Sequence, residues 1–162
     1  MIKKEKYSAA ILVIGDEILS GRTQDTNSNF IAKEMEIIGI DTNQIRVIPD
    51  EKNIIIESVN ELRVKNDYLF TTGGIGPTHD DITADSIAEA FKVDLEVNLE
   101  AYETLKKYYE KIGSEFNDIR QRMARIPKGA TLIENSISAA PGFKIENVFV
   151  FAGIPKIMKA ML

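Results

Sequence analysis

Apolar and polar residues alternate along the first half of the chain in blocks that predict strands and helices in turn. The run from Ala9 to Ile14 is short and continuously apolar, which is typical of a strand buried on both faces of a parallel sheet. Ile45 and Val47 alternate with polar residues and predict a second strand, and residues 68–71 predict a third. Helical spacing follows each strand, at Phe30, Ile31, Met35 and Ile38, then Ile55, Val59 and Leu62, then Ala84, Ile87, Ala88 and Phe91.

This alternation predicts an α/β fold with a doubly wound, mostly parallel sheet. Gly39 is expected to follow the end of the first helix, and Asp50 or Asn53 to cap the second. Ligands of such sheets bind beyond the carboxyl ends of the strands. Asp16, Glu17 and the loop of residues 73–81 follow predicted strands, so they face one cleft if those strands are neighbours.

The second half of the chain predicts helices and a C-terminal hairpin. Residues 98–113 and 115–124 have helical patterns, the first with Leu99, Tyr102, Leu105, Tyr109 and Ile112 facing inward. Short strands are expected at residues 131–133, 143–145 and 148–151, the last two joined as a hairpin.

Pro155 suits the first turn of a final helix. The apolar pattern of that helix reaches Leu162 without a capping residue. We therefore expect residues 1–162 to form one domain that is truncated at its C-terminal end.

Composition narrows the possible functions. The 162 residues carry a net charge of −5, and the only basic run is Lys3-Lys4-Glu5-Lys6, so we expect no nucleic-acid partner. The absence of cysteine excludes disulfides, thiolate nucleophiles and cysteine zinc sites. The longest apolar run is too short to cross a bilayer, so we expect a cytoplasmic protein without a membrane partner. We also expect a homo-oligomer that binds a small molecule.

The most informative segment is the glycine-rich stretch from Thr71 to Thr83. It joins a predicted strand to a helix, an arrangement that brings backbone N–H groups close to a phosphate. It lacks the lysine of a Walker A loop and the third glycine of a dinucleotide fingerprint. We expect the ligand to contact Thr72, Gly73, Gly74, Gly76, Thr78 and Thr83.

The same segment carries two acids and the only histidine of the chain. Acids beside a phosphate loop indicate a divalent metal such as Mg²⁺, because carboxylates would otherwise repel the phosphate. Asp80 and Asp81 are candidate catalytic residues and Asp81 a candidate metal ligand, although one of them could instead cap the next helix. His79 is a candidate general acid or base, or a solvent-facing residue of the loop.

Two polar segments follow the first predicted strand. Asp16 and Glu17 are candidate metal ligands, and Gly15, Ser20 and Gly21 candidate phosphate contacts; the alternative is a plain polar turn. Residues 25–29 include a helix cap, and Asn27 or Asn29 is also expected near a ligand.

Small residues near the C-terminus form a further candidate surface. Pro141 and Gly142, together with Gly153 and Pro155, permit close approach of a flat ligand, or else only punctuate turns. Arg120, Arg122 and Arg125 form a basic cluster that either binds phosphates or lies on a solvated or subunit-facing surface.

Taken together, residues 15–21, 72–83 and 152–155 resemble the molybdopterin-binding-domain superfamily. The Pro-Thr-His-Asp-Asp version at residues 77–81 is similar to the N-terminal domain of the competence/damage-inducible protein A family and to the molybdopterin-like domain of FAD synthases. The resemblance implies a three-layer α/β/α fold, phosphate held by the glycine loop, and an essential acid at Asp81.

The two branches of the superfamily imply different chemistry. The competence-protein branch implies a metal-dependent pyrophosphatase acting on ADP-ribose or related dinucleotides such as FAD. The molybdenum-cofactor branch implies molybdopterin binding or adenylylation, but it usually has other residues in place of Pro77-Thr78-His79. A non-catalytic ligand-binding module is the third alternative. We favour the pyrophosphatase.

Overall fold

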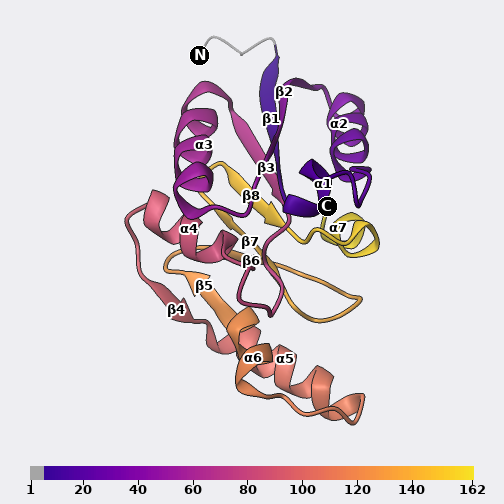
Figure 1. Cartoon of the computed structure of the whole chain (residues 1–162), viewed down its shortest axis with the longest axis vertical. Coiled ribbons are helices and arrows are strands. Elements are labelled where there is room, and N and C mark those ends of the chain that lie inside the picture. The colour runs from indigo at the N-terminus through magenta and orange to yellow at the C-terminus, as the bar shows by residue number, and fades with distance from the viewer. Residues whose placement is uncertain (1–5) are drawn as a thin grey trace.

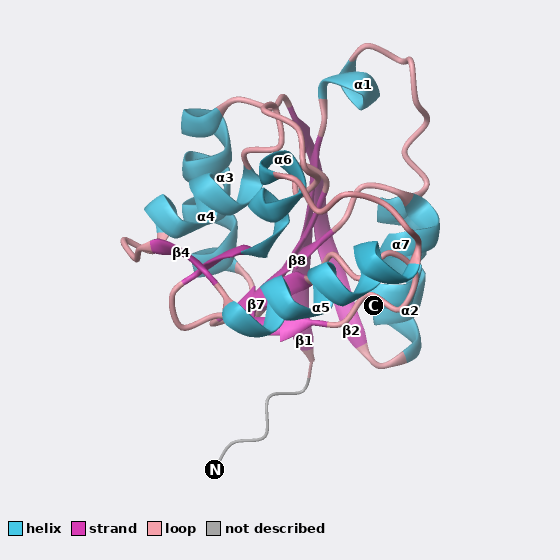
Figure 2. Cartoon of the chain, turned by 90° about the horizontal axis from the view of Figure 1, so that it is seen from below, coloured by secondary structure: helices cyan, strands magenta, loops and turns pink. Residues whose placement is uncertain are grey.

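The computed structural model describes residues 6–162 and has three layers, with helices on both faces of a central sheet (Figures 1 and 2). The sheet has six strands in the order β2-β1-β3-β8-β7-β6. Its parallel part consists of β1 (Tyr7–Ile14), β2 (Ile40–Ile48), β3 (Tyr68–Thr72) and β8 (Val148–Phe151). This confirms the predicted α/β class and the mostly parallel sheet.

The predicted C-terminal hairpin is also confirmed. β7 (Gly142–Ile145) pairs antiparallel with β8 and with β6 (Thr131–Ile133). Glu146 takes the left-handed conformation in the turn, with φ 48°, where glycine is the usual residue.

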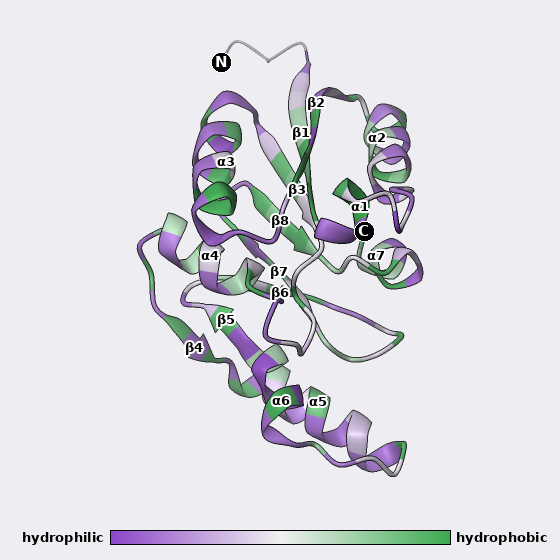
Figure 3. Ribbon diagram, in the orientation of Figure 1, coloured by the Kyte–Doolittle hydropathy of each residue, from purple (hydrophilic) through white to green (hydrophobic). Residues whose placement is uncertain are grey.

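Four helices form the outer layers. α2 (Asn27–Ile37) and α7 (Pro155–Met161) cover one face of the sheet, and α3 (Lys52–Lys65) and α4 (Thr83–Ala90) cover the other (Figure 1). Alternate residues of β1 pack on opposite faces, Ile11 with α2 and α7 and Leu12 with α3. The hydrophobic colour in Figure 3 accordingly follows the central strands. The continuously apolar segment is thus a strand buried on both faces.

The chain between α4 and β6 forms a separate unit, in which α5 (Leu99–Lys111) confirms the helix expected at residues 98–113 but two short strands were not predicted. The other elements of this unit are β4 (Leu95–Val97), α6 (Asp118–Gln121), the 3₁₀ helix η1 (Arg122–Ala124) and β5 (Arg125–Pro127). We call residues 95–127 the arm. β4 and β5 pair as a separate two-stranded sheet, and α5 and α6 lie beyond it at the lower end of the view in Figure 1.

Several local predictions were wrong. Leu99, Ile112 and Ile38 were expected to face inward but are 77%, 52% and 65% exposed, because each lies at or just beyond a helix end. Residues 115–124 form the short α6 and η1 instead of one helix. Neither Asp50 nor Asn53 caps α3, whose N-cap is Glu51 without a side-chain hydrogen bond. Gly39 follows α2 with φ 81°, as predicted.

The structure describes only part of the basic run near the N-terminus, because Lys3, Lys4 and Glu5 lie outside the described residues. Within residues 6–162, no helix has the length and apolar composition that a membrane span requires.

Candidate ligand-binding site

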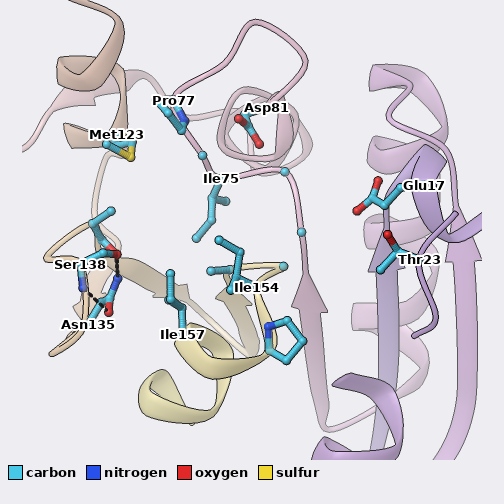
Figure 4. A pocket seen from close by; sticks show the side chains of 17 residues that line it. Glu17, Thr23, Ile75, Pro77, Asp81, Met123, Asn135, Ser138, Ile154 and Ile157 are labelled. Carbon is cyan, nitrogen blue, oxygen red and sulfur yellow. Dashed lines mark hydrogen bonds between the residues drawn. The ribbon is translucent and has the colours of Figure 1, made fainter. Parts of the chain in front are cut away.

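A cavity of about 600 Å³ opens beyond the carboxyl ends of β3 and β8 (Figure 4). The glycine loop of residues 73–77 forms one wall and Asp81 lies beside it. Ile154 and Ile157 come from the start of α7, and Met123 comes from the arm. Glu17 and Thr23 stand on the side toward β1. The cavity therefore lies where an open parallel sheet usually binds its ligand.

Steric contacts require glycine at the first two positions of the loop. Gly73 has φ +107°, and a Cβ there would lie 2.1 Å from the carbonyl oxygen of Ile14. Gly74 has φ +71°, and its Cβ would lie 2.2 Å from Thr83 Oγ1. Only glycine fits either position, because a side chain would meet both strain and a clash. The sharp turn between β3 and α4 thus depends on these glycines.

Buried hydrogen bonds hold the same turn. Thr83 is fully buried, and its hydroxyl donates to the carbonyl oxygen of Gly73 over 2.9 Å. The N–H of Thr83 donates to the carbonyl oxygen of Gly74 over 3.0 Å, and the N–H of Gly73 donates to Phe151 in β8 over 3.1 Å. Thr83 was predicted to contact the ligand, but its side chain supports the loop instead.

The next three residues of the loop keep their donors free. Within residues 6–162, the backbone N–H groups of Gly74, Ile75 and Gly76 have no hydrogen-bond acceptor. All three residues line the cavity. Consecutive free N–H groups on a concave surface form a typical anion-binding arrangement.

Asp81 belongs to a tight turn at the cavity wall. One of its carboxylate oxygens accepts the N–H of Thr78 over 2.9 Å and the Thr78 hydroxyl over 2.7 Å. The same hydroxyl lies 2.5 Å from a carboxylate oxygen of Asp80, and this contact holds the pKa of Asp80 below its ordinary value. Neither acid caps α4, whose N-cap is Ile82 without a side-chain hydrogen bond. The capping alternative is therefore wrong for both acids.

A second group of acids follows β1 and β2. Asp16 begins the short helix α1 (Asp16–Leu19). Its N–H donates to the Asp50 carboxylate over 3.0 Å, and the N–H of Asp50 donates back to the Asp16 carboxylate over 3.2 Å. Burial raises the pKa of Asp50, and the negative charges of Asp16, Glu17 and Asp80 raise it further. Acids from three loops therefore share one electrostatic environment.

These acids do not form a complete metal site by themselves. Among residues 6–162, no group of three or more histidine, aspartate or glutamate side chains is placed to hold a metal ion. Mg²⁺ commonly binds through one or two carboxylates together with substrate phosphates and water. The residues present fit a divalent ion in that way only, with Asp81 and Glu17 as the acids that line the cavity.

Asn27 connects the strand ends below the cavity. Its side-chain amide donates to Thr72 Oγ1 and to the carbonyl oxygen of Gly153, both over 2.8 Å. The N-cap residue of α2 is Thr26, without a side-chain hydrogen bond, and the preceding Asp25 accepts the N–H groups of Asn27 and Ser28. Asn27 is buried, so it fixes the spacing between α2, β3 and β8.

The structure brings seven of the nineteen predicted site residues to the cavity. Those that line it are Glu17, Gly73, Gly74, Gly76, Asp81, Gly153 and Pro155. Asn27 and Thr72 line a small adjoining hollow, and Pro141 a narrow gap beside the loop. The remaining candidates do not line the main cavity: Gly15, Asp16, Ser20, Gly21, Thr78, His79, Asp80, Thr83 and Gly142.

Part of the cavity wall was missed at the sequence level. Asn135 is buried, and it accepts the N–H groups of Ile137 and Ser138 and donates to Ser138 Oγ and the carbonyl oxygen of Ala140. It therefore organises the loop between β6 and β7 that closes one side of the cavity. Met123 was missed because the position of the arm cannot be read from a local pattern.

Comparison with known proteins identifies the family. The family described as "Probable molybdopterin binding domain" matches residues 10–162, almost the whole chain. This chain belongs to the molybdopterin-binding-domain family. A crystal structure described as the protein CinA with unknown function from Thermoplasma acidophilum is 31% identical, with a TM-score of 0.89, and the match covers 98% of this chain and 95% of that one. The predicted resemblance and three-layer fold are thereby confirmed.

Two curated relatives are longer than this chain. A CinA-like protein of Citrifermentans bemidjiense is 36% identical over 157 residues, which is 94% of this chain and 38% of that protein. A protein of Pyrococcus furiosus is 39% identical over 169 residues, covering 95% of this chain and 66% of its own length. The chain thus spans 66% and 38% of the lengths of these two relatives.

The structural likeness extends to proteins of cofactor synthesis. The tungsten cofactor synthesizing protein MoaB from Pyrococcus furiosus has a TM-score of 0.59 at 21% identity, and the match covers 98% of this chain and 89% of that one. At this identity the likeness establishes a common fold.

Proposed function

We propose that this domain binds a small molecule that combines a flat heterocycle with a phosphate group, either a nucleotide or a phosphorylated pterin. The observation that carries this proposal is the set of free N–H groups at Gly74, Ile75 and Gly76 on the cavity wall. Such groups bind phosphate oxygens without any side chain.

The rest of the cavity suits the heterocycle. Ile75, Ile154 and Ile157 point into its centre, with Met123 and Pro77 at the edge (Figure 4). An apolar surface of this kind favours a flat ring, and about 600 Å³ is an ordinary volume for a small-molecule site. The ring therefore lies against the isoleucines while the phosphates reach the loop.

We further propose that the domain hydrolyses a pyrophosphate bond, as in ADP-ribose or FAD. The acids support this reaction, because Asp81 and Glu17 stand on the cavity wall while Asp16, Asp50 and Asp80 lie close behind. A divalent ion bound with the substrate would offset the charge of the phosphates. Asp81 is held by Thr78 in a fixed orientation beside the loop. Its charge is therefore positioned before the substrate arrives.

The second candidate is binding or adenylylation of molybdopterin. It is favoured by the family, which is described as a probable molybdopterin binding domain, and by the likeness to the cofactor-synthesis protein MoaB. The phosphate of a pterin would use the same N–H groups, so both candidates share one site. A domain that binds the ligand without converting it is the third candidate.

A thermal-shift panel tests the binding proposal. ADP-ribose, FAD and a pterin are each added with and without MgCl₂, because a ligand that binds the folded state raises Tm by mass action whether or not it is converted. We expect one of them to raise Tm, more strongly with Mg²⁺. No shift with any ligand would contradict the proposal.

Product analysis then separates the candidates. Conversion of ADP-ribose to AMP and ribose phosphate in the presence of Mg²⁺ supports the pyrophosphatase. Binding of the pterin alone supports the molybdopterin candidate, and stabilisation by ADP-ribose or FAD without products supports the binding module.

A further inference from the structure

The three arginines that neighbour one another in the sequence have separate roles in the structure. Arg120 donates to Ser114 Oγ over 2.7 Å and lies over the ring of Tyr109 at 4.5 Å, so it stabilises the arm itself. Arg125 forms an ion pair with Asp85 through contacts of 3.3 and 3.1 Å. Both guanidinium groups are thus committed to contacts within the fold.

Arg122 differs from both. Within residues 6–162, its side chain has no ion pair and no hydrogen bond, although the residue is half-buried. A guanidinium presents five donors in a planar fork, and the donors of a partly exposed arginine without a protein partner are left for water or for a bound anion. The free cation therefore marks a place where an anion is expected.

The position of Arg122 points to the anion. It lines a narrow gap of about 20 Å³ together with Gly74, Gly76 and Asp81. These three residues also line the main cavity, as does the neighbouring Met123. The guanidinium thus borders the same loop that carries the free N–H groups.

The arm holds Arg122 at this place. Ala124, two residues on, is fully buried, and its carbonyl oxygen accepts the N–H of Asn98 over 2.8 Å. The Arg125–Asp85 ion pair joins the end of η1 to the first turn of α4. The segment that follows Arg122 is therefore fixed within the arm by Asn98 and joined to α4 by the ion pair.

We propose that Arg122 is a further ligand-binding residue, which donates to a phosphate oxygen of the molecule bound at Gly74–Gly76. This inference rests on the proposed function. Bidentate contacts between arginine and phosphate are strong and directional, and the positive charge also offsets the repulsion between phosphate and Asp81. Arg122 thereby selects ligands with a phosphate over the same ring without one.

The test compares the affinity of single variants for ADP-ribose and for inorganic pyrophosphate by calorimetry, at one salt concentration and with MgCl₂. Arg122→Gln is expected to weaken binding by about 10- to 100-fold, the range of a lost charged hydrogen bond. Arg122→Lys keeps the charge without the fork and is expected to be intermediate. If Arg122→Gln does not fold, the affinity of Arg122→Lys tests the role of Arg122 in its place.

Lys128→Gln is the matched control, because it removes one positive charge from an exposed position of the same region that does not line the cavity. It is expected to bind as the wild type does. Equal affinity of Arg122→Gln and the wild type, or an equal loss in Lys128→Gln, would overturn the role of Arg122 and leave the proposed function standing. Failure of the wild type to bind either compound would overturn both.

Discussion

One carboxylate oxygen of Asp81 accepts two hydrogen bonds from Thr78, one from the backbone N–H at 2.9 Å and one from the hydroxyl at 2.7 Å. An amide oxygen can accept the same two bonds, so the turn does not depend on the negative charge. The structural and chemical roles of Asp81 can therefore be separated by substitution.

Asp81→Asn is expected to melt within a few degrees of the wild type and to lose the Mg²⁺-dependent hydrolysis of ADP-ribose. Asp81→Ala removes the acceptor as well. Because Thr78 is exposed and water can replace the lost acceptor, this variant is expected to lower the free energy of unfolding by about 0.5–1.5 kcal/mol. Melting curves and product release measure the two effects. Undiminished turnover in Asp81→Asn would show that hydrolysis does not require the negative charge of Asp81.

Gly73→Ala is expected to destabilise the fold severely. The substitution combines φ +107° with a Cβ placed 2.1 Å from the carbonyl oxygen of Ile14, a contact that only backbone movement can relieve. Gly129→Ala is the control, since Gly129 has φ +85° but no atom within 4 Å of the added Cβ. It is expected to cost about 1–2 kcal/mol from the backbone conformation alone. If urea unfolding shows that Gly73→Ala and Gly129→Ala lose the same amount of stability, the steric argument is contradicted.

Thr83→Val tests the support of the glycine loop. The two side chains have similar shapes, but valine cannot donate to the carbonyl oxygen of Gly73, and the loss is expected to cost about 1–3 kcal/mol. Ligand affinity should fall as well, because the N–H groups of the loop lose their fixed arrangement. Thr83→Ser keeps the donor and is expected to retain most of the affinity. Unchanged stability in Thr83→Val would show that the loop is held by other contacts.

The raised pKa of Asp50 implies that the stability of the fold depends on pH. Burial and neighbouring carboxylates raise its pKa above the ordinary 3.8, so the folded state binds the proton more tightly than the unfolded state. The protonated Asp50 side chain therefore contributes to the free energy of unfolding. This contribution is complete when the pH lies below the pKa of Asp50 in the unfolded chain, and it is lost as the pH rises through the pKa of Asp50 in the folded state. Asp50→Asn should therefore be more stable than the wild type at pH 7, with a difference that shrinks as pH falls toward 3.8. If the difference in stability between Asp50→Asn and the wild type instead grows as the pH falls, the predicted direction of the pH dependence is wrong.

The sheet and the glycine loop could be predicted because their signals are local. Ala9–Ile14 is apolar on both faces, and glycines follow β3 directly, so strand, turn and helix can be read from neighbouring residues.

The strands of the arm and several site roles could not be predicted because they depend on distant contacts. β4 and β5 are short, and Leu95 pairs with Pro127 across the whole of α5 and α6. Thr83 and Asn27 were expected to contact ligand, but their partners, Gly73 and Gly153, are known only once the strands are placed side by side. Asp50 looked like a helix cap, whereas its carboxylate accepts the N–H of Asp16.

The most direct test of the account is an amide NMR titration of the isotopically labelled chain with ADP-ribose and, in parallel, with inorganic pyrophosphate. The account predicts that the largest shifts occur at the backbone N–H groups of Gly74, Ile75 and Gly76, with both compounds. ADP-ribose alone should also shift residues beside the apolar wall, such as Ile157. Saturable shifts centred elsewhere, for example at the surface groove beside Lys52 and Lys92, would contradict the assignment of this cavity as the ligand site.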